Sequence, residues 1–406
     1  MTTKHLRDEI VPLSMLKPHP KNPRRHSPDY IKRIERSINA FDKTNPIIVT
    51  PDYTIIAGHA RLIAAQQLGL TDFPVRIFDF TKEEAEAYMI ADNKLAEGSE
   101  WIDSILVDLF SELELKQFDL ELTGYDTSEI SSLRYAAGEP IEEDFDVDAA
   151  LSEVEGRAIR GDVWQLGKHR LMCGDCTTIS AVNNLINGEK IGMILTDPPY
   201  CSGGFQEAGK ASGSVGTRGT EMVANDTLST RGYQALMKQA LSACQCGICY
   251  IFTDWRMWIN LFDLVESCGF GVRNMIVWDK GTPGMGAGWR MQHELIMCAI
   301  KVKSPFNPKK AVGNVIQCKR TGNINHPTEK PVELLAKVID VTDMVRTVYD
   351  PFCGSGSTLI ACEQTGRTCY MMEIDPHYCD VILKRWEDYT GNTAEVITRQ
   401  ADDLQN

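Results

Sequence analysis

The sequence has no run of about 18 consecutive apolar residues, which a helix needs to cross a membrane. Its first residues, MTTKHLRDEIVPLS, also lack the apolar core of a secretory signal. The 13 cysteines are odd in number and irregularly spaced, which argues against a disulfide framework and indicates reduced thiols. With 43% hydrophobic and 24% charged residues, the chain is neither collagen-like nor wholly disordered. We therefore expect a soluble, cytoplasmic protein of more than one domain.

Positive charge is also scarce, and a formal net charge of −14 argues against a nucleic-acid partner, whose phosphates attract lysine and arginine. The deficit is local, however, because residues 83–155 hold 22 acidic and 3 basic side chains. Residues 272–337 hold 11 basic and 4 acidic side chains, and residues 4–36 hold 9 and 4. An acidic middle therefore lies between two basic flanks, each of which is either a nucleic-acid surface or an ordinary solvated one.

Hydrophobic spacing divides the chain into two halves joined by an acidic segment. Residues 1–137 begin with short β-branched runs between helical stretches, which predicts a compact unit with a helical extension. Residues 138–155 carry eight acidic and no basic side chains, and we interpret them as a solvated linker, with an acidic helix as the alternative. Residues 156–406 alternate strand-like and helical runs, which predicts an α/β fold with a mostly parallel sheet covered on both faces. The Gly- and Ser-rich segment 201–224 predicts a long loop.

The run IGMILTDPPY, residues 191–200, pairs an apolar strand with chemistry at its carboxyl end, where α/β sheets place their active sites. The Asp197 carboxylate can accept a hydrogen bond from an amine, while Pro198 and Pro199 hold a backbone carbonyl at a fixed angle for a second proton. Tyr200 then offers a stacking face to a ring. This tetrapeptide suits recognition of an amino-bearing ring, although a plain Asp-Pro turn is the structural alternative.

A second motif weakens that alternative. TVYDPFCGSGST, residues 347–358, predicts a strand, a turn containing Gly354 and Gly356, and the start of a helix. Glycines let a ligand approach the backbone, and a helix N-terminus favours electron-rich groups. The following strand ends at Glu373, about 20 positions after the turn, where nucleotide-type folds hold a ribose hydroxyl pair.

Together these motifs resemble the amino-directed DNA methyltransferases that use S-adenosyl-L-methionine, in the permuted order called the beta class. The resemblance covers about 156–390 and includes HPTEKP at 326–331. It implies a Rossmann-like methyltransferase sheet, S-adenosyl-L-methionine as cofactor, double-stranded DNA as partner, and neither a metal nor a membrane. The catalytic residues that it implies are Asp197, Pro198, Pro199 and Tyr200. The cofactor-binding residues that it implies are Asp175, Thr328, Lys330, Asp350, Phe352, Gly354, Gly356, Ser357, Thr358 and Glu373.

In this family, an aspartate at the first motif position usually accompanies N6-methylation of adenine, so Asp197 favours adenine over the N4 of cytosine. The beta-class recognition segment spans only Ser304 to Asn325 here, and its basic residues predict DNA contacts: Lys309, Lys310, Lys319 and Arg320. So short a segment predicts short or relaxed target specificity. The alternatives are an N4-cytosine enzyme, a DNA-binding protein with an inactive transferase half, and a transferase for RNA or a protein amide. A homodimer and a restriction-modification or phage-like setting remain open.

The first half resembles the ParB-like nuclease and partition-protein domain, an α+β unit related to sulfiredoxin. The matching stretches are LKPHPKNPR (16–24), PIIV (46–49), IIAGHARLIAAQQLG (55–69) and ADNKLAE (91–97). The resemblance identifies Gly58, His59 and Arg61 as the ParB-like box. The other arginine positions of nucleotide-binding members hold Ala60 and Ile63, and the sulfiredoxin cysteine is missing. The domain is therefore either a DNA-docking or scaffold unit, a retained nucleotide site, or inert structure.

Overall fold

The computed structural model describes residues 4–96, 98, 101–138, 145–154, 156–199, 228–284, 288–301, 311–320, 329–342 and 345–399. The chain separates into two compact units, Met1–Leu133 and Arg134–Asn406, which are considered one at a time. In the described residues, no helix is both long and apolar enough to cross a membrane.

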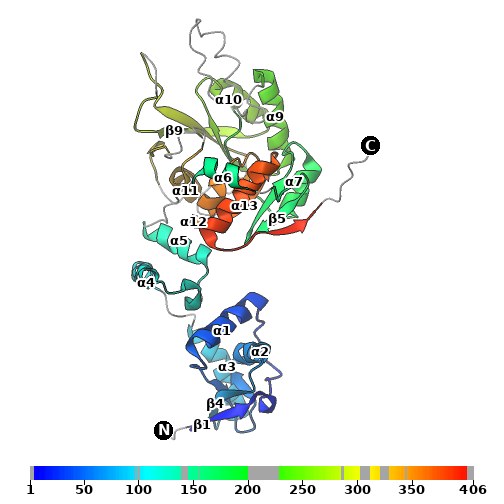
Figure 1. The fold of residues 1–406 in the computed structure, drawn as a ribbon, viewed down its shortest axis with the longest axis vertical. Helices are drawn as coiled ribbons and strands as arrows, with labels where there is room; N and C mark the ends of the chain where they lie inside the picture. The colour runs from blue at the N-terminus through cyan, green and yellow to red at the C-terminus, as the bar shows by residue number, and fades with distance from the viewer. Residues whose placement is uncertain are drawn as a thin grey trace. The chain divides into compact units, whose positions relative to one another are not determined.

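The first unit contains a four-stranded sheet in the order β1-β4-β2-β3 (Figure 1). Strand β4 lies antiparallel to β1 and parallel to β2, and the two β-branched runs β2 and β3 form a hairpin. The strands are β1 (His5–Pro12), β2 (Ile47–Val49), β3 (Ile55–Ala57) and β4 (Asp72–Phe78). The helices are α1 (Pro28–Phe41), α2 (His59–Gln67), α3 (Lys82–Ala96) and α4 (Asp103–Leu115), with short 3-10 turns at Leu13–Met15 and Leu120–Thr123. Helix α5 (Thr127–Ala137) contains the boundary between the two units. Strand β1 was not predicted, because its residues are exposed at nearly every position.

The second unit is built on a ten-stranded sheet in the order β11-β9-β10-β8-β7-β12-β13-β6-β5-β14. Its centre, from β8 to β6, is parallel throughout, which confirms the predicted α/β class. The flanking pairs β8–β10, β9–β10, β5–β6 and β5–β14 are antiparallel. The strands are β5 (Val163–Leu166), β6 (His169–Cys173), β7 (Met193–Thr196), β8 (Ile248–Thr253), β9 (Gly271–Asp279), β10 (His293–Ile300), β11 (Val315–Gln317), β12 (Thr347–Asp350), β13 (Thr368–Glu373) and β14 (Glu395–Thr398).

Helices cover both faces of this sheet (Figure 1). One face packs against α11 (Val332–Asp340), α12 (Ser357–Gln364) and α13 (Pro376–Thr390), and the other packs against α7 (Ile179–Ile186), α9 (Thr230–Ala243) and α10 (Trp258–Ser267). The chain leaves β7 toward α9 on one face and leaves β12 toward α12 on the opposite face. The crevice between β7 and β12 is therefore a topological switch point, where open α/β sheets bind ligands.

The interpretation of 138–155 as a solvated linker is wrong for its second half. Residues Val147–Glu153 form helix α6, whose N-terminus is capped by the Asp146 side chain. Val147 and Ala150 are buried against Val381, so the apolar edge of α6 packs on helix α13 of the same unit. The high charge concealed two apolar positions three residues apart, which is a helical spacing. The remaining domain boundaries stay predictions.

Candidate active site

The carboxyl ends of four adjacent parallel strands bring the predicted site residues to one edge of the sheet. Strand β12 pairs with β7 on one side and with β13 on the other, and β13 pairs with β6. Asp197 follows β7, the glycine turn follows β12, Glu373 ends β13, and Asp175 comes two residues after β6. Strands that are far apart in the sequence thus gather the two motifs, as the switch-point argument predicts.

Asp350, at the end of β12, links this strand by hydrogen bonds to the end of β7 and to the start of α12. Its buried carboxylate accepts hydrogen bonds from Thr196 Oγ1 at 2.8 Å, from Thr358 Oγ1 at 2.6 Å and from the Phe352 amide at 3.1 Å. Burial raises the pKa of Asp350 to about 6, against these donors, which lower it. Because both threonine hydroxyls are directed at Asp350, this carboxylate fixes the end of β7 next to Asp197 and the start of α12.

The glycine turn is held open by backbone geometry. Gly354 and Gly356 have φ angles of +55° and +88°, a region in which side chains are strained. A Cβ built on Gly354 would meet no atom within 4 Å, so open space lies beside that residue. The Gly354 amide donates to Glu373 Oε2 at 2.9 Å, which joins the turn to the end of β13.

Glu373 is half-buried, and its carboxylate has one acceptor position to spare. Its Oε1 accepts the backbone amides of Ile374 at 2.8 Å and Asp375 at 3.0 Å, and its Oε2 accepts the Gly354 amide. A carboxylate has about four lone-pair directions, so one remains for another donor. Burial raises the pKa of Glu373 to about 7 in spite of these amides. Asp175 is exposed beside it and accepts the Thr177 amide and hydroxyl.

The Asp197 carboxylate forms an ion pair with a buried lysine. Lys330, which is 5% exposed, forms an ion pair with Asp197 Oδ2 and lies 3.4 Å from Glu294 Oε2 of β10. Lys280, at the end of β9, pairs with the other oxygen of Glu294. Lys330 was expected to bind the cofactor; in this structure its ammonium group contacts Asp197, and its role toward the cofactor stays a prediction.

Sequence reasoning missed four members of this site. Glu294 and Lys280 lie in or beside strands that read as plain core, and Arg385 lies on α13, which was not predicted. Glu329 belongs to HPTEKP but received no role. The signal that could have found them is charge at buried positions, because buried ions are almost always paired.

Several predicted residues lie outside the described residues: Tyr200, Lys309, Lys310, Thr328 and the loop 201–224. Lys319 and Arg320 are exposed just after β11, the edge strand that pairs in parallel with β9. Among the described residues, no group of three or more His, Cys, Asp or Glu side chains is arranged to hold a metal ion.

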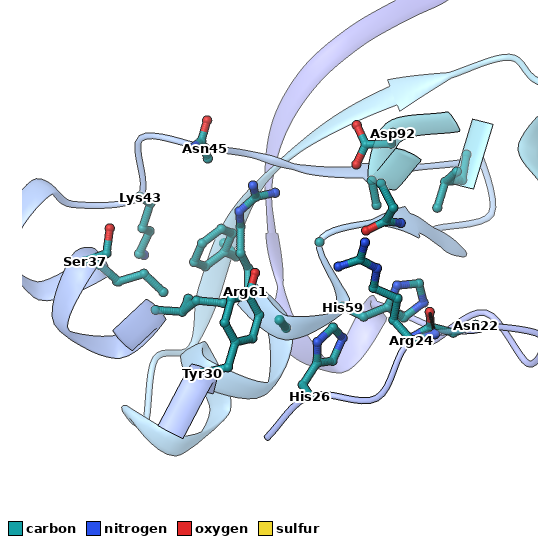
Figure 2. A pocket seen from close by; sticks show the side chains of 18 of the residues that line it. Asn22, Arg24, His26, Tyr30, Ser37, Lys43, Asn45, His59, Arg61 and Asp92 are labelled. Carbon is teal, nitrogen blue, oxygen red and sulfur yellow. Dashed lines mark hydrogen bonds between the residues drawn. The ribbon is translucent and has the colours of Figure 1, made fainter. Parts of the chain in front are cut away.

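The first unit contains a cavity of about 520 Å³ at the ParB-like box. Gly58, with φ of +99°, precedes α2, and Figure 2 shows Arg24, His26, His59 and Arg61 around the cavity. Burial lowers the pKa of His59 to about 4, so its ring is neutral at pH 7, and its Nε2 accepts the His19 amide at 3.2 Å. Arg61 Nη1 donates to the Pro46 carbonyl at 3.3 Å. Gly58, His59 and Arg61, the residues of the predicted box, all line this cavity.

Comparison with known families matches these parts. Residues 191–384 match a family model described as DNA methylase, residues 2–94 match the ParB N-terminal domain, and residues 104–160 match the ParB-methyltransferase HTH domain. The YubD protein of Escherichia coli (strain K12), whose name describes it as a methylase, is 31% identical over 211 residues, which are 52% of this chain and 86% of YubD. The ParB-like nuclease domain-containing protein YnaK of the same organism is 36% identical over 18% of this chain and 84% of its own length.

Among solved structures, the M1.HpyAVI–SAM complex is similar at 23% identity and a TM-score of 0.40, over 53% of this chain and 97% of that chain.

Proposed function

The chain belongs to the DNA methylase family, with a ParB N-terminal domain ahead of its methylase half, and on that premise we propose that it methylates the N6 amine of adenine in DNA. S-adenosyl-L-methionine is the cofactor of this methyltransferase chemistry. The observation that carries the proposal is the direct pairing of β7 with β12, because it places Asp197 next to the glycine turn. A methyl donor at the turn and an amine at Asp197 are then neighbours.

The residues at the turn fit such a cofactor. The open space beside Gly354 leaves room for the methionine portion to approach the backbone. The spare acceptor position on Glu373 suits a ribose hydroxyl, and the exposed Asp175 carboxylate, two residues after the neighbouring strand β6, suits the adenine side. Phe352 is half-buried between β12 and the turn and offers an apolar wall.

When bound, S-adenosyl-L-methionine supplies an electrophilic methyl group. The chain's own contribution is to position the acceptor and to receive the positive charge that develops on the amine. Asp197 is the group for this task, because an ionised carboxylate accepts the amine's hydrogen bond and attracts the growing positive charge. The target base must leave the duplex to reach Asp197, which costs a few kcal/mol. Stacking on Tyr200, worth about 1–3 kcal/mol, would offset part of that cost.

The choice of adenine rests on Asp197 at the first position of the catalytic motif, and N4 of cytosine is the alternative acceptor. We expect the target site to be about four base pairs or fewer, because each bidentate base contact contributes only about 1–3 kcal/mol of discrimination. The described part of the recognition segment offers two exposed cations, Lys319 and Arg320. Binding that depends on phosphate contacts should weaken steeply as salt concentration rises.

The test is transfer of tritium from labelled S-adenosyl-L-methionine to unmethylated genomic DNA, followed by chromatography of the nucleosides. Label in N6-methyladenine supports the proposal, and label in N4-methylcytosine assigns the chain to the alternative. Single-stranded DNA and RNA serve as parallel substrates. No transfer to any of them would refute the methyltransferase proposal. Modified-base sequencing of the product then gives the target, and one strict motif of six or more defined base pairs would contradict the short site.

The cavity of the first unit favours a second function, the binding of a small phosphate-bearing ligand. A nucleotide fits a cavity of about 520 Å³ that is lined by the side chains of Arg24 and Arg61. DNA docking would instead call for a flat surface. Neutral His59 would contribute a hydrogen bond and no positive charge. Calorimetric titration of the whole protein with each of the four ribonucleoside triphosphates and with inorganic triphosphate tests this proposal. Loss of any binding in Arg24→Ala, with no loss in exposed Arg25→Ala, would locate the ligand in the cavity.

A further inference from the structure

Two adjacent residues, Glu329 and Lys330, contact the two halves of the active site from one short stretch of backbone. Lys330 extends to Asp197, the acceptor side. Glu329 extends to the donor side, where its carboxylate lies 2.9 Å from Arg385 Nη1 and 3.4 Å from the Ser357 hydroxyl. Arg385 in turn donates to the Ser355 carbonyl at 3.0 Å, within the glycine turn. Residues 329–330 therefore join the turn of β12 to the aspartate of β7.

Burial makes these contacts specific. Glu329 and Arg385 have side chains that are 2% and 3% exposed, and that of Lys330 is 5% exposed. Ions so far from water are tolerated only when they are paired with good geometry. The ammonium group of Lys330 also lies 5.3 Å from the centre of the Phe252 ring, which limits where it can move.

Acidic and basic side chains alternate in the chain of ion pairs that begins at Asp197. Burial lowers the pKa of Lys330, but Asp197 and Glu294 outweigh it and hold that pKa above its ordinary value. Burial raises the pKa of Glu294, yet Lys330 and Lys280 hold it below its ordinary value. Asp197, Lys330 and Glu294 thus carry a net charge of −1 next to the acceptor, and Lys280 balances it one step farther away.

We propose that Lys330 is the positioning residue that orients the Asp197 carboxylate, and that the Glu329–Arg385 pair fixes Lys330 relative to the cofactor turn. This inference rests on the proposed function of Asp197. In this proposal Lys330 does not bind the cofactor directly but orients Asp197, the residue that faces the acceptor amine. A single net negative charge then faces the amine, which stabilises the positive charge that forms during transfer. Without Lys330, Asp197 would face Glu294 and the nearby Asp350 with no cation between them, and like charges favour protonation of one carboxyl group.

The experiment compares Lys330→Met with the wild-type chain in single-turnover tritium transfer to unmethylated genomic DNA. We expect the rate to fall about 100-fold, the loss that a misplaced reacting group produces. Calorimetry should give the same affinity for S-adenosyl-L-methionine as in the wild type. The acid limb of the pH–rate profile should move to higher pH, because a lost cation raises the pKa of the carboxylate that it faced. Lys330→Arg, which keeps the charge, should recover part of the rate.

Two further variants keep the test decisive. Lys337→Met removes an exposed lysine from the neighbouring helix, where it pairs with Glu333 at 2.6 Å, and should change nothing. Lys330→Met combined with Glu294→Gln restores the charge balance and serves if the single variant does not fold. The double variant should remain slow, because balance without Lys330 does not orient Asp197.

The outcomes separate the two proposals. A wild-type rate in Lys330→Met or in the double variant would overturn the positioning role while leaving the methyltransferase proposal intact. A loss of cofactor affinity as large as the loss of rate would return Lys330 to cofactor binding and also overturn it. A wild-type chain that transfers no methyl group to any nucleic acid would refute the proposed function itself.

Discussion

If Glu373 binds the ribose, as we propose, the affinity for S-adenosyl-L-methionine should rise with pH. In the free protein, burial raises the pKa of Glu373 to about 7. A ribose hydroxyl donates its hydrogen bond to the ionised carboxylate, so binding favours that form and lowers the pKa in the complex. Affinity should therefore reach its maximum about one pH unit above 7 and fall as the pH drops through 7. With a pKa near 7, the ionised fraction falls about tenfold between pH 8 and pH 6, so binding should weaken by about 1.4 kcal/mol.

The assay is calorimetric titration of the whole chain with S-adenosyl-L-methionine from pH 5.5 to 8.5, in two buffers of different ionisation enthalpy. Proton release near pH 6.5 should appear as a difference in heat between the buffers. Glu373→Gln should bind more weakly at pH 8 and lose the pH dependence, whereas Glu395→Gln, on the exposed strand β14, should behave like the wild type. A wild-type affinity that is flat between pH 6 and pH 8 would refute the reasoning that this carboxylate holds the ribose.

Three further predictions concern the site and its support. Asp197→Ala should abolish methyl transfer without weakening cofactor binding by calorimetry, because the side chain faces the acceptor; appreciable turnover in tritium transfer would move the catalytic site elsewhere. Gly354→Leu should block cofactor binding by filling the open space at the turn, while Gly188→Leu, at a similar left-handed position with no atom within 4 Å of its Cβ, should cost only stability. Val147→Ala should lower the free energy of unfolding of the second unit by about 2 kcal/mol in calorimetric melting, because it removes two buried carbons and leaves a small cavity. The control is Ala149→Ser, at an exposed position of the same helix. Equal effects of the two substitutions would show that α6 does not pack on α13.

The parallel centre of the sheet could be predicted from the sequence because its strands are short apolar runs that end in recognisable turns. The runs ending at Asp197, Asp350 and Glu373 all form the strands that were expected, and two of them, β7 and β12, pair in parallel. The short β-branched runs expected in the first unit likewise form its strands β2 and β3. Local pattern and tertiary role coincide at these positions.

The rest was hidden because it depends on contacts between residues that are far apart. Strand β14 is exposed at every position and exists because it pairs with β5, which no local pattern reveals. Helix α6 was masked by its surrounding acidic charge. The partners of Lys330 could not be predicted, since Asp197 is 133 positions away along the chain and only the folded sheet brings them together.

The central position of β7 has a consequence for how the chain is made. This strand is buried at all four positions and needs a partner on each side, β8 and β12. Strand β12 leaves the ribosome about 150 residues after β7, which at about 5–20 residues per second is a delay of roughly 8–30 s. During that time one apolar edge of the nascent sheet is open to pairing with other chains. The permuted motif order thus carries a cost in biogenesis, and soluble yield should depend on translation speed and on chaperones that cover that edge.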